Sequence, residues 1–403
     1  MSLNVVIVGH IDHGKSTLIG RLLYDSDRIP DERLAEMQKL IEEYKRRFEF
    51  AYFLDSFEEE LKEERTIDTT RVLFKGRDYY TVVDVPGHQE FIKNMLTGAD
   101  HAQAAILVVS CVDGVQEQTR RHAFLVHMLG VREIIVGINK MDMVNYDEEV
   151  FSRVKKSVVR LLETLGYKDT LFVPISAMEG DNIYKASQHM PWYGGVTLIG
   201  ALDAIKPVPE KEKPLRFVVQ DLYRVDSQKV AVGRVEAGTV RKGDELIFQP
   251  SGVVTRVEAI KSFPREIESA QSGDSIGIVV NAEIGRGNIG GHTRFPPKAV
   301  RNFLGEVVLL DGTLSQGGRF EIMSGAKRSK CTVAKIREKI SSETGEVLST
   351  DATEIGVNEA ATVIFETEPM VVEKFAEIPE LGRFILARDG KNVGAGIVLE
   401  AVA

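Results

Sequence analysis

Apolar runs alternate with amphipathic stretches over the first 205 residues of the chain. Residues 5–8 read Val-Val-Ile-Val, a β-branched run without a polar position, and residues 134–138 form a second apolar run. Such runs are typical of strands that are buried on both faces, and long helical segments separate them here. We therefore predict an α/β domain over residues 1–205, with a doubly wound, mostly parallel sheet.

The pattern changes after residue 205. Residues 206–213 combine lysine, glutamate and proline, which is the composition of a linker between domains. Beyond this linker the helical periodicity is largely lost, and short strand-like segments are separated by turns that contain glycine. This pattern indicates small β-barrels. A Pro-Pro step at 296–297 marks the next boundary, so we predict a multidomain chain with one β-barrel at 214–298 and another at 299–403.

Composition narrows the range of partners and compartments. A chain of 403 residues is too long for one core and fits two or three domains. The formal net charge of −9 gives no overall attraction for polyanions, although a local patch can still contact RNA. The longest apolar run, at 102–112, is too short to span a bilayer. Because the chain runs straight into its first predicted strand, we expect no signal peptide, a cytoplasmic protein, and neither DNA nor a membrane as partner.

A glycine-rich turn follows the first predicted strand. Residues 9–16 read Gly-His-Ile-Asp-His-Gly-Lys-Ser and match the phosphate-loop pattern G-x-x-x-x-G-K-[ST]. Between a strand and a helix, this turn directs backbone N–H groups and the helix dipole at a polyphosphate, with an incidental glycine-rich turn as the alternative. Lys15 is expected to reach the β- and γ-phosphates, and Ser16 to bind Mg²⁺. The residues predicted to contact the phosphates are Gly9, His10, Asp12, His13, Gly14, Lys15, Ser16 and Thr17.

The apolar run at 134–138 is followed by the tetrapeptide Asn-Lys-Met-Asp. Guanine presents N1–H and N2–H donors that one carboxylate can accept together, and adenine lacks this pair, so Asp142 would select guanine. We expect Asn139 to tie the base to the phosphate loop and the Lys140 stem to cover the ring. Alone, this tetrapeptide fits a surface turn equally well, but after a phosphate loop it predicts GTP or GDP rather than ATP.

A further loop is predicted to contact the base. It follows the apolar run at 171–175, the last strand expected in the α/β domain. Its residues are Ser176, Ala177 and Met178.

The metal and the attacking water are predicted to lie at segments between these two nucleotide motifs. The predicted strand at 79–84 ends in Asp84, which is placed to hold Mg²⁺ through water. Gly87 lets its backbone N–H approach the γ-phosphate because it has no Cβ. His88 is the candidate catalytic residue that orients the attacking water, with a hydrogen-bonded turn histidine as the alternative. Thr66 can bind Mg²⁺ and sense the γ-phosphate, so the predicted metal ligands are Ser16, Thr66 and Asp84.

With these elements in order, the chain resembles the translational GTPase superfamily over its whole length, most specifically in the Asp-Val-Pro-Gly-His form of residues 84–88. Residues 29–63 look like the helical insert of the elongation factor 1-alpha branch. Within this branch, the strongest likeness is to the GTPase subunit of the two-subunit ATP sulfurylase, at residues 14–25, 118–122, 139–151 and 190–194. The resemblance implies a Mg²⁺-dependent GTPase with two barrels behind its N-terminal domain. It also implies a separate, small catalytic partner subunit that forms adenosine 5′-phosphosulfate.

Two departures from the family pattern bear on this resemblance. Residues 64–65 are Glu-Arg, where superfamily members usually have Gly-Ile before the switch threonine, so an apolar wall over the catalytic histidine is missing. Gly325 and Arg328 stand where aminoacyl-tRNA carriers have His-x-x-His. Both departures, Glu64-Arg65 and the stretch at 324–330, favour the sulfurylase subunit. The alternative is an elongation-factor-1-alpha-like translation factor that delivers aminoacyl-tRNA, or a release or rescue factor, to the ribosome.

A few other residues have no assigned chemistry. Cys111 and Cys331 lie far apart in apolar contexts and are predicted to be buried thiols. The single tryptophan, Trp192, is expected to anchor a loop to the core. Residues 120–122 read Arg-Arg-His early in a predicted helix, where they would face either a partner or solvent.

Overall fold

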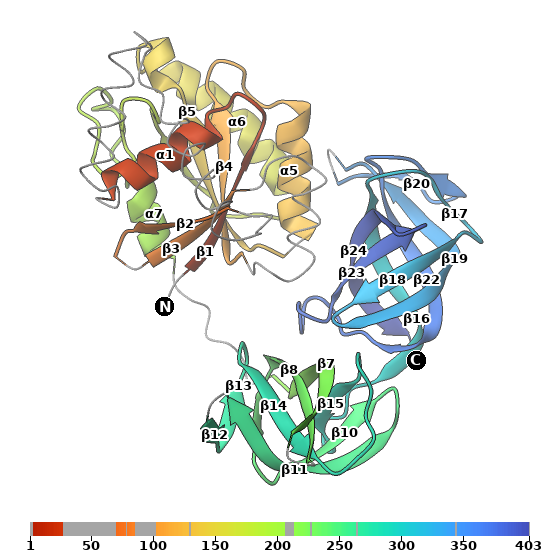
Figure 1. Cartoon of the computed structure of the whole chain (residues 1–403). Coiled ribbons are helices and arrows are strands. Elements are labelled where there is room, and N and C mark those ends of the chain that lie inside the picture. The colour runs from red at the N-terminus through yellow and green to blue at the C-terminus, as the bar shows by residue number, and fades with distance from the viewer. Residues whose placement is uncertain are drawn as a thin grey trace, which may run out of the picture. The chain divides into compact units, whose positions relative to one another are not determined.

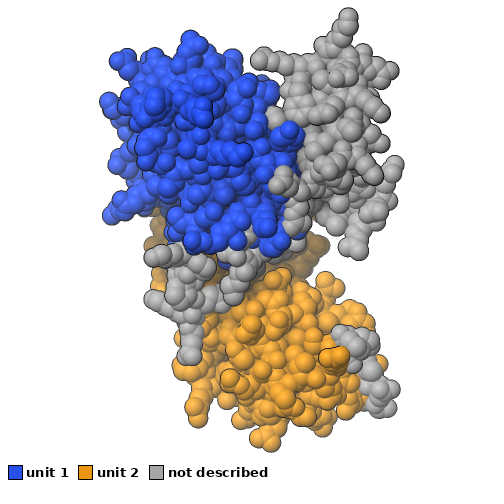
Figure 2. All heavy atoms as spheres, turned by 90° about the vertical axis from the view of Figure 1, so that its left-hand side faces the viewer, with its two compact units in different colours: residues 1–95, 99–207, 342–345 blue, residues 96–98, 208–341, 346–403 orange. Residues whose placement is uncertain are grey.

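The computed structural model describes residues 3–26, 70–77, 79–84, 102–128, 130–205, 213–225, 228–262, 265–342 and 345–402. The chain divides into two compact units, which Figure 2 colours separately. Unit 1 comprises residues 1–95, 99–207 and 342–345, and unit 2 comprises residues 96–98, 208–341 and 346–403. The described elements of unit 1 alternate strands and helices, whereas those of unit 2 are strands (Figure 1).

Unit 1 is built around one six-stranded sheet with the strand order β2-β3-β1-β4-β5-β6. Its described elements are β1 (Leu3–Gly9), α1 (Lys15–Asp25), β2 (Thr70–Lys75), β3 (Tyr79–Asp84), β4 (Ala104–Ser110), α5 (Glu117–Met128), β5 (Glu133–Asn139), the 3-10 helix η1 (Met141–Val144), α6 (Glu148–Thr164), β6 (Leu171–Pro174) and α7 (Leu198–Ala204). All neighbouring strands run parallel except β2, which is antiparallel to β3. This confirms the predicted α/β domain with a mostly parallel sheet.

Helices cover both faces of this sheet because its strands are apolar on both sides. Val5 and Ile7 of β1 belong to one buried cluster with the apolar side of α1 and α7. Val6 and Val8 alternate with them and therefore point to the opposite face, where α5 packs on β1 and β4. The carboxyl ends of β1, β3, β5 and β6 meet at one edge, the place where ligands bind in open α/β sheets.

The local sequence also explains how α6 begins and packs. The Asp147 side chain accepts hydrogen bonds from the backbone N–H groups of Glu149 and Val150 at 2.7 and 3.2 Å, so it caps the helix. Phe151, Val154, Val158, Leu161 and Leu162 are buried along one stripe. The opposite stripe is charged and exposed, as expected for a helix that covers a sheet.

Unit 2 consists of two closed six-stranded barrels and confirms the second part of the predicted fold class. The first barrel joins the order β10-β15-β7-β8-β14-β11 into a ring through the β10–β11 pair, and the second joins β18-β23-β24-β16-β22-β19 through the β18–β19 pair. Each has its own buried cluster, centred on residues such as Phe217 and Phe248 in the first and Phe303 and Phe365 in the second.

The strands of unit 2 follow in chain order. They are β7 (Arg216–Val225), β8 (Gln228–Ala237), β9 (Thr239–Arg241), β10 (Glu245–Gln249), β11 (Val253–Ser262), β12 (Arg265–Ile267), β13 (Ser269–Gln271), β14 (Ser275–Val280), β15 (Ile289–His292), β16 (Ala299–Leu309), β17 (Leu314–Ser315), β18 (Arg319–Ser324), β19 (Lys327–Ile340), β20 (Val347–Ser349), β21 (Glu354–Ile355), β22 (Ala360–Val371), β23 (Arg383–Arg388) and β24 (Lys391–Val402).

Several sequence predictions fall outside the described residues. They concern the insert at 29–63, Glu64, Arg65, Thr66, Gly87, His88 and the linker up to residue 212. Asp84 is the last position of β3. The domain boundaries remain predictions. Among the described helices, none combines the length and apolar character that crossing a membrane requires.

Candidate nucleotide-binding site

The predicted phosphate loop forms the turn between β1 and α1. The strand ends at Gly9 and the helix begins at Lys15, so residues 10–14 are the connection. Gly14 caps the helix with φ +88°, in the left-handed region that favours glycine. A Cβ at Gly14 would lie 2.4 Å from Asn139 Nδ2. Glycine is therefore required here both by the backbone conformation and by the close approach of β5.

The Lys15 side chain is hydrogen-bonded to the backbone of this loop. Its ammonium group donates hydrogen bonds to the carbonyl oxygens of Gly9 and His10, both at 2.9 Å. The two bonds hold the ammonium group against the loop backbone and place a positive charge next to the N-terminus of α1. A cation and a helix N-terminus together fit the phosphates of a nucleotide.

Two side chains of α5 hold the backbone of the phosphate loop. Gly9 N–H donates to His122 Nδ1 at 3.2 Å, and Ile11 N–H donates to Gln118 Oε1 at 2.9 Å. Gln118 and His122 are four residues apart and so lie on one face of the helix. Sequence reasoning left His122 between a partner and solvent, and the structure instead buries it against the loop. The four-residue spacing places Gln118 and His122 on one helix face, but nothing in the local sequence identifies the backbone groups that they contact.

His13 lies fully buried beneath the loop. Its Nδ1 is 3.3 Å from the Val108 carbonyl oxygen, which can only accept, so Nδ1 carries the proton. Burial lowers the pKa of His13 to about 4. The imidazole is therefore neutral at physiological pH and supports the loop without adding charge to it.

Asn139, the last residue of β5, connects the phosphate loop to the predicted base loop. Its Nδ2 donates to the His13 carbonyl oxygen at 2.9 Å, and its Oδ1 accepts from Ala177 N–H at 2.9 Å. The residue is 2% exposed. The sequence predicts that Asn139 ties the base to the phosphate loop. In the structure its side chain joins the phosphate loop to the predicted base loop.

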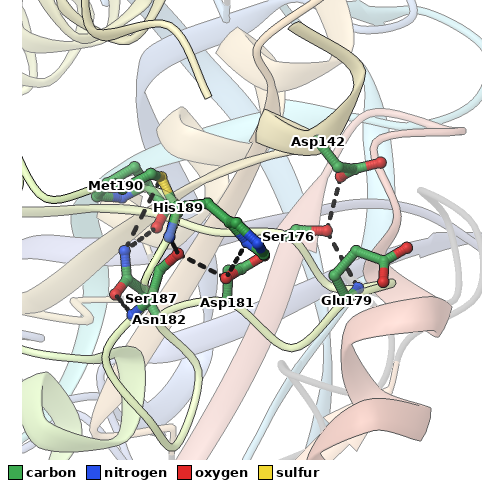
Figure 3. A network of polar contacts seen from close by, with 9 residues as sticks. Asp142, Ser176, Glu179, Asp181, Asn182, Ser187, His189 and Met190 are labelled. Atoms are coloured by element: carbon green, nitrogen blue, oxygen red, sulfur yellow. Dashed lines mark hydrogen bonds and ion pairs between the residues drawn. The ribbon is translucent and has the colours of Figure 1, made fainter. Parts of the chain in front are cut away.

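Asp142 and the base loop are joined by a short hydrogen bond. Ser176 Oγ donates to Asp142 Oδ1 at 2.6 Å and accepts from Glu179 N–H at 3.1 Å (Figure 3). Gly180 N–H donates to the Ser176 carbonyl oxygen at 2.8 Å, which closes the loop into a tight turn. The neighbouring hydroxyl thus holds the carboxylate of Asp142 in one orientation.

The loop beyond Ser176 is fixed by a second polar network. Asp181 Oδ1 accepts from Ser187 Oγ at 2.5 Å and lies 3.2 Å from His189 Nδ1 (Figure 3). Asn182 Oδ1 accepts from Ser187 N–H at 2.8 Å. These contacts make residues 176–189 one hydrogen-bonded body. Trp192 anchors its far end, because its Nε1 donates to the Tyr146 carbonyl oxygen at 2.9 Å and its ring packs on Phe151, as predicted.

The two cysteines are buried and free, as predicted. Cys111 is part of the candidate site, since its thiol donates to the Lys140 carbonyl oxygen at 3.1 Å. Lys140 itself has φ +67°, and its ammonium lies 3.9 Å from the Asp113 carboxylate. Burial raises the pKa of the Cys111 thiol to about 12, so the group acts as a weak donor and not as a thiolate.

Two predicted metal ligands lie at the start of α1 and at the end of β3. Ser16 is the second residue of α1 and is exposed, while Asp84 ends β3, the parallel neighbour of β1. Hydroxyl and carboxylate oxygens at this sheet edge are the donor types that Mg²⁺ takes. The other predicted contributors, Thr66, Gly87 and His88, lie outside the described residues.

Three family models match the chain one after another. The model of the elongation factor Tu GTP binding domain matches residues 1–219, that of elongation factor Tu domain 2 matches residues 228–289, and the GTP-eEF1A C-terminal domain-like model matches residues 302–399.

Curated relatives match the chain from end to end. The elongation factor 1-alpha of Archaeoglobus fulgidus is 42% identical over 99% of this chain and 97% of its own length. Those of Thermococcus gammatolerans and Pyrococcus furiosus are 41% and 42% identical over 98% of this chain, each across 97% of its own length. A solved structure of Sup35 complexed with GDP aligns at 24% identity with a TM-score of 0.47, over 100% of this chain and 94% of that one. This last likeness is too low to bear on function.

Proposed function

Because this chain belongs to the family of GTP-binding translation factors, in the elongation factor 1-alpha branch, we propose that it is a GTP-switched carrier of aminoacyl-tRNA to the ribosome. The proposal is supported by the end-to-end match to archaeal elongation factors 1-alpha. The family binds GTP and GDP with Mg²⁺ and hydrolyses GTP. The structural observation behind the nucleotide-binding part of the proposal is the Asn139 side chain, which links the phosphate loop to the predicted base loop.

We assign the nucleotide contacts in two groups. Lys15 and the backbone donors of residues 12–17 would bind the phosphates, with Ser16 as a metal ligand. Asp142 and residues 176–178 would bind guanine, with Ser176 orienting the carboxylate. The bound metal would supply positive charge that stabilises the oxygens of the phosphoryl group during GTP hydrolysis.

Hydrolysis would depend mostly on positioning and electrostatics, with His88 orienting the attacking water. In a His88→Ala variant, GTP binding should persist while ribosome-stimulated hydrolysis falls by orders of magnitude. Single-turnover hydrolysis with radiolabelled GTP measures this difference. Retained stimulated turnover would remove His88 from the mechanism.

A second candidate is the GTPase subunit of ATP sulfurylase. The observation in its favour is the hairpin between β18 and β19, which turns at Gly325 and Ala326 and carries Lys327 and Arg328 at its tip. The His-x-x-His stretch of aminoacyl-tRNA carriers is missing at this hairpin. The curated relatives described above are elongation factors, so they support the translation factor and give the sulfurylase subunit no support.

Stimulation of GTP hydrolysis separates the two candidates. We expect turnover by the full chain to rise at least tenfold when ribosomes and aminoacyl-tRNA are added together. In the comparison sample, a catalytic sulfurylase subunit with ATP and sulfate replaces the ribosomes and the aminoacyl-tRNA. Stimulation in the comparison sample alone would overturn the translation-factor proposal in favour of the second candidate.

A further inference from the structure

Arg21 connects the helix of the phosphate loop to the base loop. It lies on α1, six residues after Lys15, and its Nη1 donates to the Met178 carbonyl oxygen at 3.2 Å. Its Nε donates to Asp25 Oδ2 at 2.9 Å, four residues further along the same helix. The side chains of Arg21 and Asp25 are only 18% and 17% exposed. The guanidinium is therefore held in one orientation by a partner on its own helix while it contacts a loop 157 positions further along the chain.

The backbone of the base loop leaves room for this guanidinium. Gly180 has φ +86°, and a Cβ there would lie 2.1 Å from Arg21 Nη2 and 2.4 Å from Arg21 Cζ. Arg21 thus packs against the chain at Gly180 as well as bonding to Met178. Two neighbouring points of one tight turn are in contact with one side chain.

The turn that Arg21 contacts is the turn that presents the base-reading groups. Met178 directly follows Ala177, whose N–H is held by Asn139 Oδ1. Gly180 closes the turn onto Ser176, whose hydroxyl orients Asp142. Asp142 and Asn139 hold the turn from the sheet edge, and Arg21 holds it from α1. A displacement of Met178 would move Ala177 and Ser176 with it, because the turn is hydrogen-bonded across its ends.

We propose that Arg21, fixed by Asp25, is a positioning residue for guanine recognition that sets the base loop relative to the phosphate-loop helix. The inference rests on the proposed nucleotide site and adds to it a residue outside the phosphate loop, the Asn-Lys-Met-Asp tetrapeptide and the base loop. Loss of Arg21 would weaken contacts to the base while the phosphate contacts at Lys15 remain. A purely structural role would weaken both equally.

The test compares GDP, IDP and inorganic pyrophosphate on the full chain. IDP lacks the 2-amino group that Asp142 would accept, and pyrophosphate reports on the phosphate loop alone. In Arg21→Met, which keeps the apolar stem, we expect GDP affinity to fall about tenfold, the loss typical of a charge-assisted hydrogen bond. The ratio of GDP to IDP affinity should shrink, and pyrophosphate affinity should stay within about twofold. Arg160→Met is the matched control, because Arg160 is exposed on α6, and it should leave all three affinities unchanged.

Two further variants keep the test decisive. Arg21→Lys retains a cation but has a single donor nitrogen, and it should recover part of the GDP affinity. Asp25→Asn should lower the GDP affinity less than Arg21→Met does. An unchanged ratio of GDP to IDP affinity in both Arg21→Met and Asp25→Asn would overturn the inference, as would an equal loss of GDP and pyrophosphate binding. Failure of the unaltered chain to bind GDP would instead overturn the nucleotide site itself.

Discussion

At the scale of single residues, Asn139 connects the two loops of the candidate site through its side chain. Its amide group bonds at one end to the phosphate loop and at the other to the base loop. Both partners are backbone groups, and the side chain is almost fully buried. A buried amide that satisfies two backbone groups is costly to remove, because each group then loses its partner without gaining water.

Replacing Asn139 with alanine should therefore weaken both the fold and the site. We expect the free energy of unfolding of unit 1 to fall by about 1–3 kcal/mol and GDP affinity to fall roughly a hundredfold, since two hydrogen bonds are lost. Urea denaturation and equilibrium titration with GDP measure the two effects. Unaltered GDP affinity in Asn139→Ala would show that the bridge does not organise the site.

His13 should make the stability of the folded chain depend on pH. Burial lowers its pKa to about 4 from the ordinary value of 6.5, so the unfolded chain takes up a proton at a pH where the folded chain does not. Stability should accordingly fall as the pH drops from 6.5 towards 4, by roughly 3 kcal/mol in total. In His13→Gln this part of the pH dependence should vanish. Urea denaturation of both proteins at pH 7 and pH 5 checks the sign, and identical pH dependence would contradict it.

At the scale of elements, α5 acts as a support for the phosphate loop. The helix packs on β1 and β4 through its apolar side, which fixes its distance from the loop. Gln118 and His122 extend from it to the N–H groups of Ile11 and Gly9. A rigid helix that bonds to a loop at two points keeps the loop in one conformation, which lowers the entropy lost on binding a ligand.

Removing one of these supports should loosen the loop. In His122→Ala the Gly9 N–H loses its acceptor, and we expect GDP to dissociate about tenfold faster, as loss of one buried hydrogen bond implies. His127→Ala is the matched control, because His127 is an exposed histidine on the same helix. Stopped-flow release of a fluorescent GDP analogue measures both variants. Equal rates in the two variants would argue against a supporting role for α5.

Local sequence determines only part of this arrangement. The strands β1 and β5 could be predicted because uninterrupted apolar runs specify buried parallel strands, and the phosphate loop could be predicted because it needs glycine at a left-handed position, Gly14. The contacts of His122 and Arg21 could not be predicted. They join residues 113 and 157 positions apart, and nothing in either local sequence identifies its partner. Such contacts follow from the strand order, which brings the strand ends together only in the folded sheet.

At the scale of the whole molecule, the two barrels of unit 2 contact each other through a buried ion pair. Arg216, at the start of β7, donates from Nε to Glu373 Oε1 at 2.5 Å and from Nη1 to the Phe295 carbonyl oxygen at 2.9 Å. The two side chains are 6% and 16% exposed. A buried cluster that includes Val218 and Leu381 surrounds the pair. Apolar burial and this ion pair therefore occur together where the two barrels meet.

Replacing only one residue of this ion pair should destabilise unit 2 more than replacing both residues. In Arg216→Met the Glu373 carboxylate remains buried without its cation, and we expect unit 2 to lose about 3 kcal/mol of stability. The double variant Arg216→Met/Glu373→Leu should regain most of this loss, because no charge is left uncompensated. Urea denaturation of the single and double variants measures the difference. A double variant as unstable as the single one would rule out the ion pair as the cause.

The proposed function also belongs to this scale, since carrying aminoacyl-tRNA requires the whole chain. The most direct measurement is protection of an aminoacyl-tRNA ester from spontaneous hydrolysis by the full protein saturated with a non-hydrolysable GTP analogue. We expect the ester half-life to lengthen severalfold with the analogue and to return to its free value with GDP. An unchanged half-life, with binding of the analogue confirmed in the same sample, would contradict aminoacyl-tRNA carriage and leave the GTPase subunit of a sulfurylase as the better explanation.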